Sequence, residues 1–587
     1  MVRLMCVVRK LAHVRCWNRC RSCADRCPCH GAHGTHGAAP LRRRAPFGVA
    51  LAVSVGAVLF AAHAHAQVPN AGQAMRDIET PRPTLPSTAA PALDIPKSDD
   101  AQAPLPDTGP RVHVRAFTLD GNRVFDSGTL LPLVADLAGR DLSFAELQQA
   151  AARITTYYRE RGYVLARAYL PHQEIDDGVV RIDVVEGRYG KIELNNRSRV
   201  LDVAVRQPLA GIRPDGVVRG GDLERSLVLL DDLAGVSARG TLRPGDAAGT
   251  TDLVVDVDKG PFATGSLEFD NYGDASTGRY RLGGSVNVNS PLRLGDQLSL
   301  RGLVSNEWQR YYRAGYQVPV GPLSTRLGVA YSEMHYRLAG EFSDLEYHGR
   351  ASVQSVFVAQ PLVRARQMDL TAQIQYENKN LHDTYGIFDL QTDKNVGLWS
   401  FSLSGSSEDR WFGGGRNGVS VTFGAGRLRS NDPIGMNTLA KTIGSFSKLN
   451  VSALRVQSLG RRFQFYAQFN AQLASRNLDS SEKFSLGGPY GVRAYGFSAG
   501  SGDQGWQASA ELRYRAAPGL QLSTFIDTGR VQLNGHAGRG MGTRFTVRFA
   551  DACAERLGSG RSVFLSEFCS TTLGNGDIVI KQMRIPK

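Results

Sequence analysis

Two charged residues stand in surroundings where their chemistry could serve a defined purpose. Arg493 lies in a long glycine-rich stretch, and Asp527 lies in the segment Phe525-x-Asp527-x-Gly529. A guanidinium presents a planar fork of donors, and a carboxylate accepts several hydrogen bonds, so both residue types are suited to docking one segment on another. Taken singly, each would be an ordinary surface arginine or turn aspartate.

No other group of residues has the spacing that catalysis or metal binding needs. The pairs Cys20-x-x-Cys23 and Cys27-x-Cys29 could hold zinc, but no pattern of a folded domain surrounds them. We find no nucleophile elbow in a strand-turn-helix setting and no nucleotide-binding loop. The histidines of the body are scattered: His113, His172, His335, His348, His382 and His536. We expect no catalytic residue, no metal and no cofactor, and therefore a protein that is not an enzyme.

Charge and cysteine content restrict the partners and the compartment. The chain has 69 Lys and Arg against 55 Asp and Glu, a net charge of +14. Residues 1–66 hold ten basic side chains and one acidic, and residues 533–587 hold eight and four, so the part between them is nearly neutral. A neutral body offers no basic face for phosphates, which excludes nucleic acid. Residues 30–552 contain no cysteine, which suits an oxidising compartment.

Residues 1–66 have the order of a secretory signal peptide. Arg42-Arg43-Arg44 precede an apolar run over 46–62, and Ala64-His65-Ala66 form a small-residue cleavage site. A membrane anchor is the alternative, but a run of about 17 residues is short of the roughly 20 that a helix needs to span. Residues 1–40 would be an overlong n-region, translated from a start codon placed too early.

Residues 67–260 combine a linker with two small modules. Residues 67–111 are rich in proline and are expected to be an extended linker after a short helix, Ala71–Glu79. Residues 112–188 show the order strand, helix, helix, strand, strand, and residues 189–260 repeat it about 70 residues later. Tandem α+β modules are more often binding platforms than enzymes.

Particular residues mark the helices of these modules. The first module should have a helix near 129–138 and a second one that begins with a capping box formed by Ser143 and Glu146. In the second module, Asp222 is expected to cap a helix that Gly235 ends.

The residue pattern from 261 to 587 is typical of a β-sheet. Segments of about ten residues alternate apolar and polar side chains, as in 462–474, and about thirteen of them lie between Thr264 and Gln532. A soluble sandwich could show the same alternation. The signal peptide, the near absence of helix and strands long enough to cross a bilayer favour an outer-membrane barrel, with apolar residues toward lipid and polar residues toward a wet lumen.

The same alternation orients the candidate aspartate. Leu520, Leu522 and Ile526 share the lipid-facing positions of one strand, so Asp527 points into the lumen. Arg493 belongs to an unusually long connection, residues 477–505, in the barrel half.

Together these features resemble one family of membrane proteins. Two modules of the polypeptide-transport-associated (POTRA) type, a carboxy-terminal barrel, the loop Gly-Val-Arg-Ala-Tyr-Gly at 491–496 and the Phe525-x-Asp527-x-Gly529 strand are similar to the outer-membrane transporters of two-partner secretion. The haemolysin and filamentous-haemagglutinin transporters are members. The resemblance covers residues 68–532. It implies α+β periplasmic modules followed by a transmembrane antiparallel β-barrel of about 16 strands.

The resemblance also implies a role for the two charged residues. In that family the long loop folds back into the barrel, and its arginine contacts an aspartate of the inner wall, so Arg493 would dock on Asp527. This role is positional rather than catalytic. The marked residues are Gly491, Val492, Arg493, Tyr495 and Gly496 in the loop, and Phe525, Asp527 and Gly529 on the wall.

Partners and location follow from the same resemblance. The helix Ala71–Glu79 would plug the pore at rest, and the modules 112–188 and 189–260 would capture a large, unfolded secreted exoprotein by strand addition. The barrel, 261–587, would lie in the outer membrane of a Gram-negative bacterium, in contact with its lipid. It would be inserted by the barrel-assembly machinery as a monomer or weak dimer, with the modules in the periplasm.

The sequence departs from the family at two places. Ala494 stands where the family usually has glycine, and the chain ends in Ile585-Pro586-Lys587 instead of an aromatic residue. Residues 533–587 are atypical, because the alternation weakens where about three more strands are expected. A reading-frame change late in the gene or a divergent ending would explain this, and the former would leave the barrel open.

Three alternatives share parts of this pattern. A barrel-assembly insertase has modules, a loop arginine and a barrel, but two modules with a plug-like segment and a linker favour secretion. An enzyme anchored by a barrel would need a recognisable active site, and a passive porin would lack periplasmic modules. The sequence does not identify the exported substrate.

Overall fold

The computed structural model describes most of the chain after residue 109. Described are residues 69–79, 92–94 and 110–533, apart from Asp176, Ile434, Ala494, Ser498, Ala499, Pro518 and Gly519, together with the strand backbone of 543–556, 567–569, 579–581 and 583–584. The expected signal peptide, most of the linker and much of the atypical ending lie outside these residues. No helix within the described residues is long and apolar enough to cross a membrane.

The first module is a three-stranded sheet covered by one long helix. Its elements are β2 (Val112–Val114), β3 (Ala116–Asp120), α3 (Ser127–Leu130), η2 (Leu131–Leu133), η3 (Ala135–Leu137), β4 (Arg140–Leu142), α4 (Phe144–Glu160), β5 (Arg167–Tyr169) and β6 (Val179–Val185). The sheet has the order β3-β6-β5, and β2 pairs with β4. Ile154 and Tyr158 of α4 are completely buried against this sheet, which places the core between helix and strands.

One helix of this module was predicted correctly and the other was wrong. Ser143 accepts a hydrogen bond from the N–H of Glu146 at 3.3 Å, and the Glu146 carboxylate accepts one from the N–H of Ser143 at 2.8 Å, so the capping box is present. The helix expected near 129–138 is broken into α3, η2 and η3. Pro132 has no N–H to continue an α-helical ladder, which explains the interruption.

The second module repeats this arrangement. It contains β7 (Arg188–Asn196), α5 (Asp202–Arg206), α6 (Gly220–Asp231), β8 (Val236–Pro244) and β9 (Thr250–Lys259). Asp222 lies in the first turn of α6 and does not cap it: the N-cap position is Arg219, without a side-chain hydrogen bond. Its sheet has the order β1-β8-β9-β7, because β1 (Ala92–Asp94) pairs in parallel with the edge of β8.

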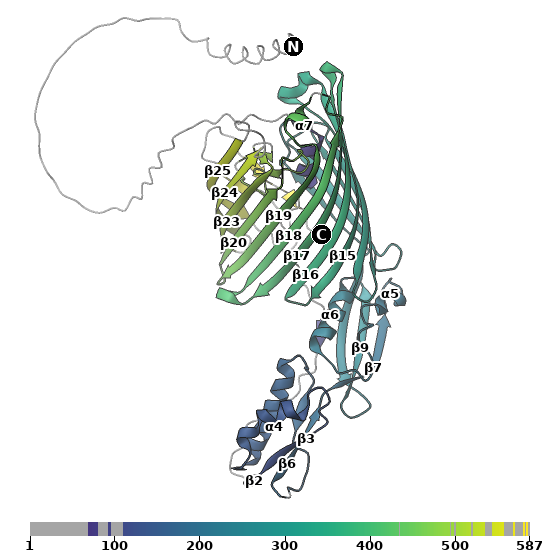
Figure 1. The fold of residues 1–587 in the computed structure, drawn as a ribbon, viewed down its shortest axis with the longest axis vertical. Coiled ribbons are helices and arrows are strands. Elements are labelled where there is room, and N and C mark those ends of the chain that lie inside the picture. Colours follow the sequence, from purple (N-terminus) through teal and green to yellow (C-terminus); the bar gives the residue numbers. More distant parts are fainter. Residues whose placement is uncertain are drawn as a thin grey trace, which may run out of the picture. The chain divides into compact units, whose positions relative to one another are not determined.

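The rest of the chain forms one large antiparallel sheet, whose strands run side by side in Figure 1. The described residues between Thr264 and Gln532 confirm the thirteen strands that the alternation predicted. They are β10 (Ala263–Asp270), β11 (Arg281–Asn289), β12 (Gln297–Ser305), β13 (Arg310–Val320), β14 (Thr325–Arg337), β15 (Tyr347–Arg364), β16 (Met368–Tyr385), β17 (Leu390–Asp409), β18 (Gly415–Ser430), β19 (Gly444–Leu459), β20 (Phe463–Ala474), β23 (Gln504–Ala517) and β24 (Leu520–Leu533).

The sheet closes into a barrel through the end of the chain. After β24 comes β25 (Thr543–Arg556), followed by the short strands β26 (Glu567–Cys569), β27 (Val579–Lys581) and β28 (Met583–Arg584). Two residue pairs join β28 to β10, against eight between β10 and β11. Closure is therefore thinnest where the sequence departs from the alternating pattern.

Apolar side chains face outward from the barrel. On β24, Ile526 is 58% exposed, whereas the next residue, Asp527, is completely buried. On β20, Phe469 and Leu473 are exposed, and Gln472 between them is buried. The alternation thus separates an apolar outer surface from a polar lumen, as a lipid-embedded barrel requires.

A pair of arginine substitutions on one strand tests this assignment of faces. Ile526→Arg, near the middle of β24, should lower the free energy of unfolding by about 2–4 kcal/mol, because it places a cation in hydrocarbon. Ser523→Arg on the lumen side of the same strand should change it by no more than about 0.5 kcal/mol. Urea unfolding in lipid vesicles measures both values. Equal losses would contradict the assignment.

Candidate functional site

The chain between β20 and β23 is a long loop that lies against the barrel wall. It contains two short strands, β21 (Phe484–Ser485) and β22 (Ser501–Gly502), which pair with each other. Between them Gly487 forms an isolated bridge with Val492. A Cβ atom on Gly487 would lie 2.1 Å from the carbonyl oxygen of Gly496, so only glycine lets the tip fold back this tightly.

The structure brings together Arg493 of this loop and Asp527 of β24. Nε of Arg493 donates to Oδ2 of Asp527 at 2.8 Å, and Nη2 donates to Oδ1 at 2.9 Å. The backbone N–H of Arg493 donates to the same carboxylate at 3.1 Å. Because Asp527 has no exposed surface, this bidentate contact is shielded from bulk water.

Three wall residues complete the surroundings of the guanidinium. Ser509 accepts a hydrogen bond from Arg493 at 3.1 Å and donates one to Asp527 at 2.7 Å, and Glu511 accepts one from Arg493 at 3.1 Å. The guanidinium carbon lies 3.4 Å from the ring centroid of Phe525, a cation–π contact. Burial lowers the pKa of Arg493, but Asp527 and Glu511 raise it by more, so the guanidinium stays charged.

An apolar contact lies beside the ion pair. Leu486 and Val492 of the loop are buried with Val531 of β24. A Cβ atom on Gly529 would come within 2.5 Å of the Leu486 side chain, so the wall glycine leaves room for the loop. Each marked wall residue therefore contacts the loop: Phe525 stacks, Asp527 accepts hydrogen bonds, and Gly529 allows close approach.

The other marked loop residues take different positions. A Cβ atom on Gly491 would lie 2.5 Å from the carbonyl oxygen of Leu486, which explains the need for glycine. Tyr495 is 40% exposed. No described atom lies within 4 Å of a Cβ atom built on Gly496. The structure thus does not bring Tyr495 and Gly496 into the contact between Arg493 and Asp527.

A second set of ion pairs, missed in the sequence, holds the start of the loop. Asp479 lies 2.9 Å from Nζ of Lys394 on β17. Glu482 lies 2.8 Å from Nζ of Lys379 on β16 and 2.7 Å from Nζ of Lys448 on β19. Both acids are buried. The sequence signal for these ion pairs was three lysines at lumen-facing strand positions and two acids in the loop. Which lysine pairs with which acid depends on how the loop lies in the barrel.

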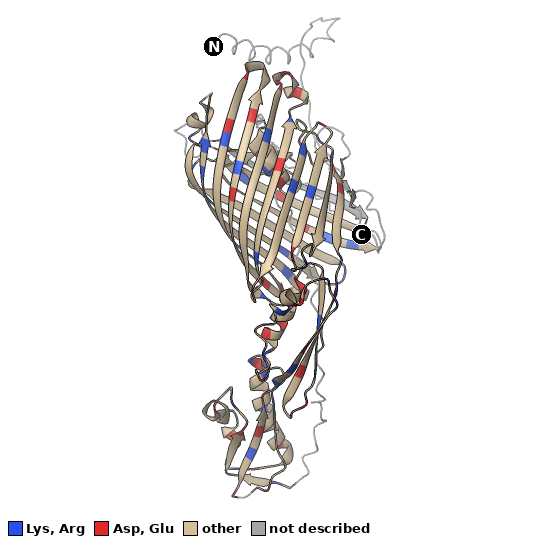
Figure 2. Ribbon diagram, turned by 90° about the vertical axis from the view of Figure 1, so that its right-hand side faces the viewer, with Lys and Arg blue, Asp and Glu red and all other residues tan. Residues whose placement is uncertain are grey.

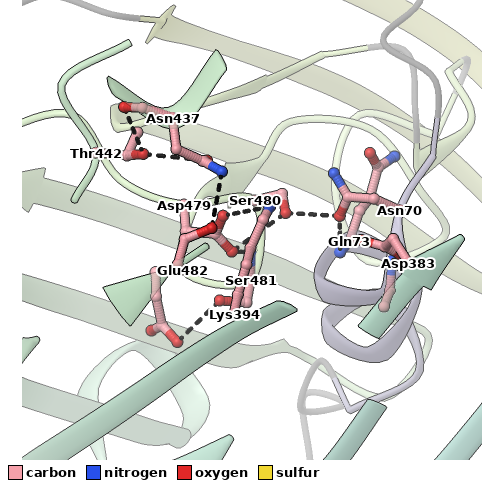
Figure 3. Close-up of polar contacts among 12 residues, drawn as sticks. Asn70, Gln73, Asp383, Lys394, Asn437, Thr442, Asp479, Ser480, Ser481 and Glu482 are labelled. Carbon is pink, nitrogen blue, oxygen red and sulfur yellow. Dashed lines mark hydrogen bonds and ion pairs between the residues drawn. The ribbon is translucent and has the colours of Figure 1, made fainter. Parts of the chain in front are cut away.

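Helix α2 (Ala71–Glu79), which the sequence predicted as a helix, rests on this part of the loop (Figure 3). Nη1 of Arg76 donates to the carbonyl oxygen of Ser480 at 2.8 Å, and Oγ of Ser480 donates to Oδ1 of Asn70 at 2.6 Å. The N–H of Ala71 donates to Asp383 of β16 at 2.8 Å. The helix therefore contacts both the loop and the wall.

Glu79, the last residue of α2, is bound to the wall. Glu79 accepts hydrogen bonds from Tyr311 at 3.1 Å, from Arg313 at 3.3 Å and from Ser332 at 2.7 Å. Met75 and its apolar neighbours pack into a cluster with barrel residues that face inward. A cavity of about 770 Å³ lined mostly by polar residues of β16–β20 and the loop adjoins the helix. The lumen therefore holds a polar space beside the helix.

The charges of the second set of ion pairs persist over a wide pH range. Burial raises the pKa of Asp479, but Lys394 outweighs it and holds the pKa at about 2. Burial likewise raises the pKa of Glu482, and Lys379 with Lys448 holds it at about 2. Unfolded carboxyls titrate near pH 4, so the stabilisation is complete above about pH 5 and is lost as pH falls toward 2.

These groups position the chain and offer no catalytic arrangement. Asp479 and Glu482 are paired with lysines and stay ionised at neutral pH, so neither is poised to exchange a proton. Among the described residues, no cluster of three His, Cys, Asp or Glu side chains could hold a metal ion.

Removing the loop's two acids should loosen both the loop and the helix. Asp479→Asn combined with Glu482→Gln leaves Lys394 and Lys448 without counter-charges and leaves Lys379 with Glu377 alone, at a cost of about 3–5 kcal/mol for a buried pair. We expect larger single-channel conductance in planar bilayers, and wild-type conductance to rise only as pH falls below about 4. Glu341→Gln, an exposed acid outside the lumen, is the matched control and should conduct like wild type. Wild-type conductance in the double variant would contradict the role of these ion pairs.

Comparison with known proteins shows which family has this architecture. Residues 249–545 match the family described as haemolysin secretion/activation protein ShlB/FhaC/HecB, and residues 112–187 match the ShlB-type POTRA domain. The chain is 26% identical to the heme/hemopexin transporter protein HuxB of Haemophilus influenzae, over 79% of this chain and 83% of that protein. It is 25% identical to the outer membrane transporter CdiB of Dickeya dadantii, over 70% of this chain and 75% of that protein.

A solved structure shares the fold. CdiB from Escherichia coli superposes with a TM-score of 0.64 at 20% identity, covering 88% of this chain and 95% of that one. The combination of a POTRA domain, an antiparallel barrel and a family match over half of the sequence leads to one conclusion. The chain belongs to the ShlB/FhaC/HecB family of two-partner secretion transporters, which lie in the outer membrane with their POTRA modules in the periplasm.

Proposed function

We propose that the chain captures a large exoprotein of the haemolysin or adhesin type in the periplasm, while it is unfolded, and exports it through the barrel. The observation that carries this proposal is a polar lumen occupied by two parts that side-chain contacts hold against the wall, the helix α2 and the long loop. A lumen that stays closed would not need ion pairs to hold the helix and the loop in place. A lumen that opens and closes does need them.

Capture would use the edges of the two module sheets. In the first module β3 and β5 are edge strands, and in the second β7 is one. Strand addition supplies backbone hydrogen bonds without demanding a particular sequence, which suits a long unfolded chain. The edge of β8 is already paired with β1, so the linker would have to leave before a substrate could use that edge.

The contact between Arg493 and Asp527 would give the loop one defined resting place. In a hydrated lumen such a pair contributes roughly 0.2–1 kcal/mol, whereas breaking a desolvated pair costs about 3–5 kcal/mol. The complete burial of Asp527 and the added contacts to Ser509 and Glu511 support the larger figure. No nucleotide is needed, because a substrate that folds outside the cell cannot return.

Arg493→Ala and Asp527→Ala should each reduce secretion at least about tenfold, because the first leaves the buried Asp527 carboxylate without a counter-charge and the second leaves Arg493 with Glu511 alone. Barrel insertion should be intact, as judged by the heat-modifiable migration of the folded protein. The measurement is exoprotein in the medium relative to the periplasm.

Two exposed residues serve as controls for those variants. Arg530→Ala removes an arginine from the outer side of β24, and Asp344→Ala removes an aspartate from an exposed turn, η4 (Gly340–Leu345). Both should secrete like wild type. Full secretion by both the Arg493 and the Asp527 variants would remove the docking hypothesis.

Deletion of residues 112–260 should abolish capture, because it removes every module edge available to a substrate. Co-purification of the exoprotein with the detergent-solubilised transporter measures capture directly. Undiminished capture by the remaining barrel would show that the modules are not the receptor.

A further inference from the structure

Basic side chains gather on the outer face of the barrel at one end of the long strands. The modules precede β10 and lie in the periplasm, so β10 ends outside the cell and each following strand reverses direction. The extracellular ends therefore include the start of β13, the end of β14 and the start of β15. In Figure 2, blue bands lie on the upper parts of several long strands.

Strand register places these side chains next to one another. Arg310 is paired with His335, His335 with Arg350, and Arg350 with His382. These positions face outward, because the residue that precedes or follows each one, such as Tyr311, Met334 or Leu381, is buried in the lumen against α2. Neighbouring strands thus present four basic side chains in one continuous row.

Beside this row lies a hollow in the outer surface. Its volume is about 610 Å³, and its lining includes Arg350, His382, Asn380, Asn395 and Arg429. Register pairs Asn380 with Asn395 and Asn395 with Arg429. Short amide side chains therefore form the floor, and longer arginines stand on either side.

The hollow sits where the apolar surface of the barrel ends. Tyr376 and Trp399 lie four residues farther along their strands from Asn380 and Asn395, toward the middle of the membrane. Their ring centroids are 4.9 Å apart. Below them the outer surface is apolar, as at Ile374, which is 51% exposed. Aromatic residues mark the interface between hydrocarbon and headgroups, so the hollow lies at headgroup depth.

The row of basic side chains and the hollow beside it keep a net positive charge after the ion pairs within them are counted. Two acidic side chains, Glu333 and Asp393, lie among the outward-facing residues of this region, and both form ion pairs. Glu333 pairs with Arg350 and His335, and Asp393 pairs with His382. Arg427 and Arg429 are exposed, and within the described part of the chain neither guanidinium group makes a hydrogen bond or ion pair, although both residues join the backbone ladder of β18. The region therefore complements an anionic headgroup.

We propose that this hollow binds the phosphate group of a glycolipid in the outer leaflet of the outer membrane. Guanidinium groups match phosphate oxygens in a bidentate fork, and asparagine amides add donors at the floor. An acylated phosphosugar fits both halves of the surface, because its phosphate meets the arginines while its acyl chains cover the apolar strands below. This role is separate from export and concerns only the outer face of β13–β18.

The test uses the full chain in detergent and diphosphorylated lipid A as the probe, with binding followed by native mass spectrometry. Arg427→Ala combined with Arg429→Ala should weaken lipid A binding at least about tenfold. Arg461→Ala combined with Arg462→Ala removes the same charge from the exposed turn between β19 and β20, at the periplasmic end, and should bind like wild type. All variants lie on exposed positions, and heat-modifiable migration confirms that each is folded.

Two further arms separate the lipid from free phosphate. Dephosphorylated lipid A should bind at least about tenfold more weakly to wild type, and inorganic pyrophosphate should compete only at much higher concentration than lipid A. Equal binding by both double variants, no effect of removing the phosphates, or equally strong competition by pyrophosphate would each overturn the proposal.

Discussion

The interior of this barrel depends on one buried ion pair, that of Arg493 and Asp527. A long, glycine-rich loop has high conformational entropy and would sample many positions unless a few strong contacts selected one. The bidentate hydrogen bonds, the cation–π contact with Phe525 and the full burial of the carboxylate supply such contacts at one point of the wall. The rest of the loop is arranged around that point.

The loop in turn supports the helix that occupies the lumen. Its first part is tied to the wall by Asp479 and Glu482, and Ser480 between them contacts α2. The start and the tip of the loop are thus held by different charges on different strands. A chain that displaces α2 would disturb the acidic end first, while Arg493 could keep the tip in place. The loop and the helix therefore contact each other, and the loop is held to the wall at two separate places.

Local patterns predicted much of the fold, and contacts between distant segments could not be predicted. Strict alternation, as on β20, identifies strands and their faces because one side must meet lipid and the other water. The capping box of Ser143 signals a helix start for an equally local reason. Pro132 broke a helix that its apolar neighbours suggested, and Asp222 entered a helix instead of capping it. In both cases the local pattern admitted two outcomes.

In the candidate site, too, local patterns could be predicted and contacts between distant segments could not. The orientation of Asp527 followed from parity alone, but its partner came from resemblance to a family. The ion pairs of Asp479 and Glu482 were missed because they join residues far apart in the chain, 85 positions for Lys394, 103 for Lys379 and 34 for Lys448. Parity along β16, β17 and β19 could have placed these lysines on the lumen side, but it does not say what they contact. Likewise, Gly529 gained a meaning only when Leu486 was found against it.

A double-mutant cycle on Arg493 and Asp527 tests the central interaction most directly. The free energy of unfolding is measured in lipid vesicles for wild type, for each alanine variant and for the double variant, so that the coupling energy is isolated from other losses. A desolvated, bidentate pair predicts coupling of at least about 1.5 kcal/mol. Additive losses, within about 0.5 kcal/mol, would show that the two residues do not hold the loop to the wall.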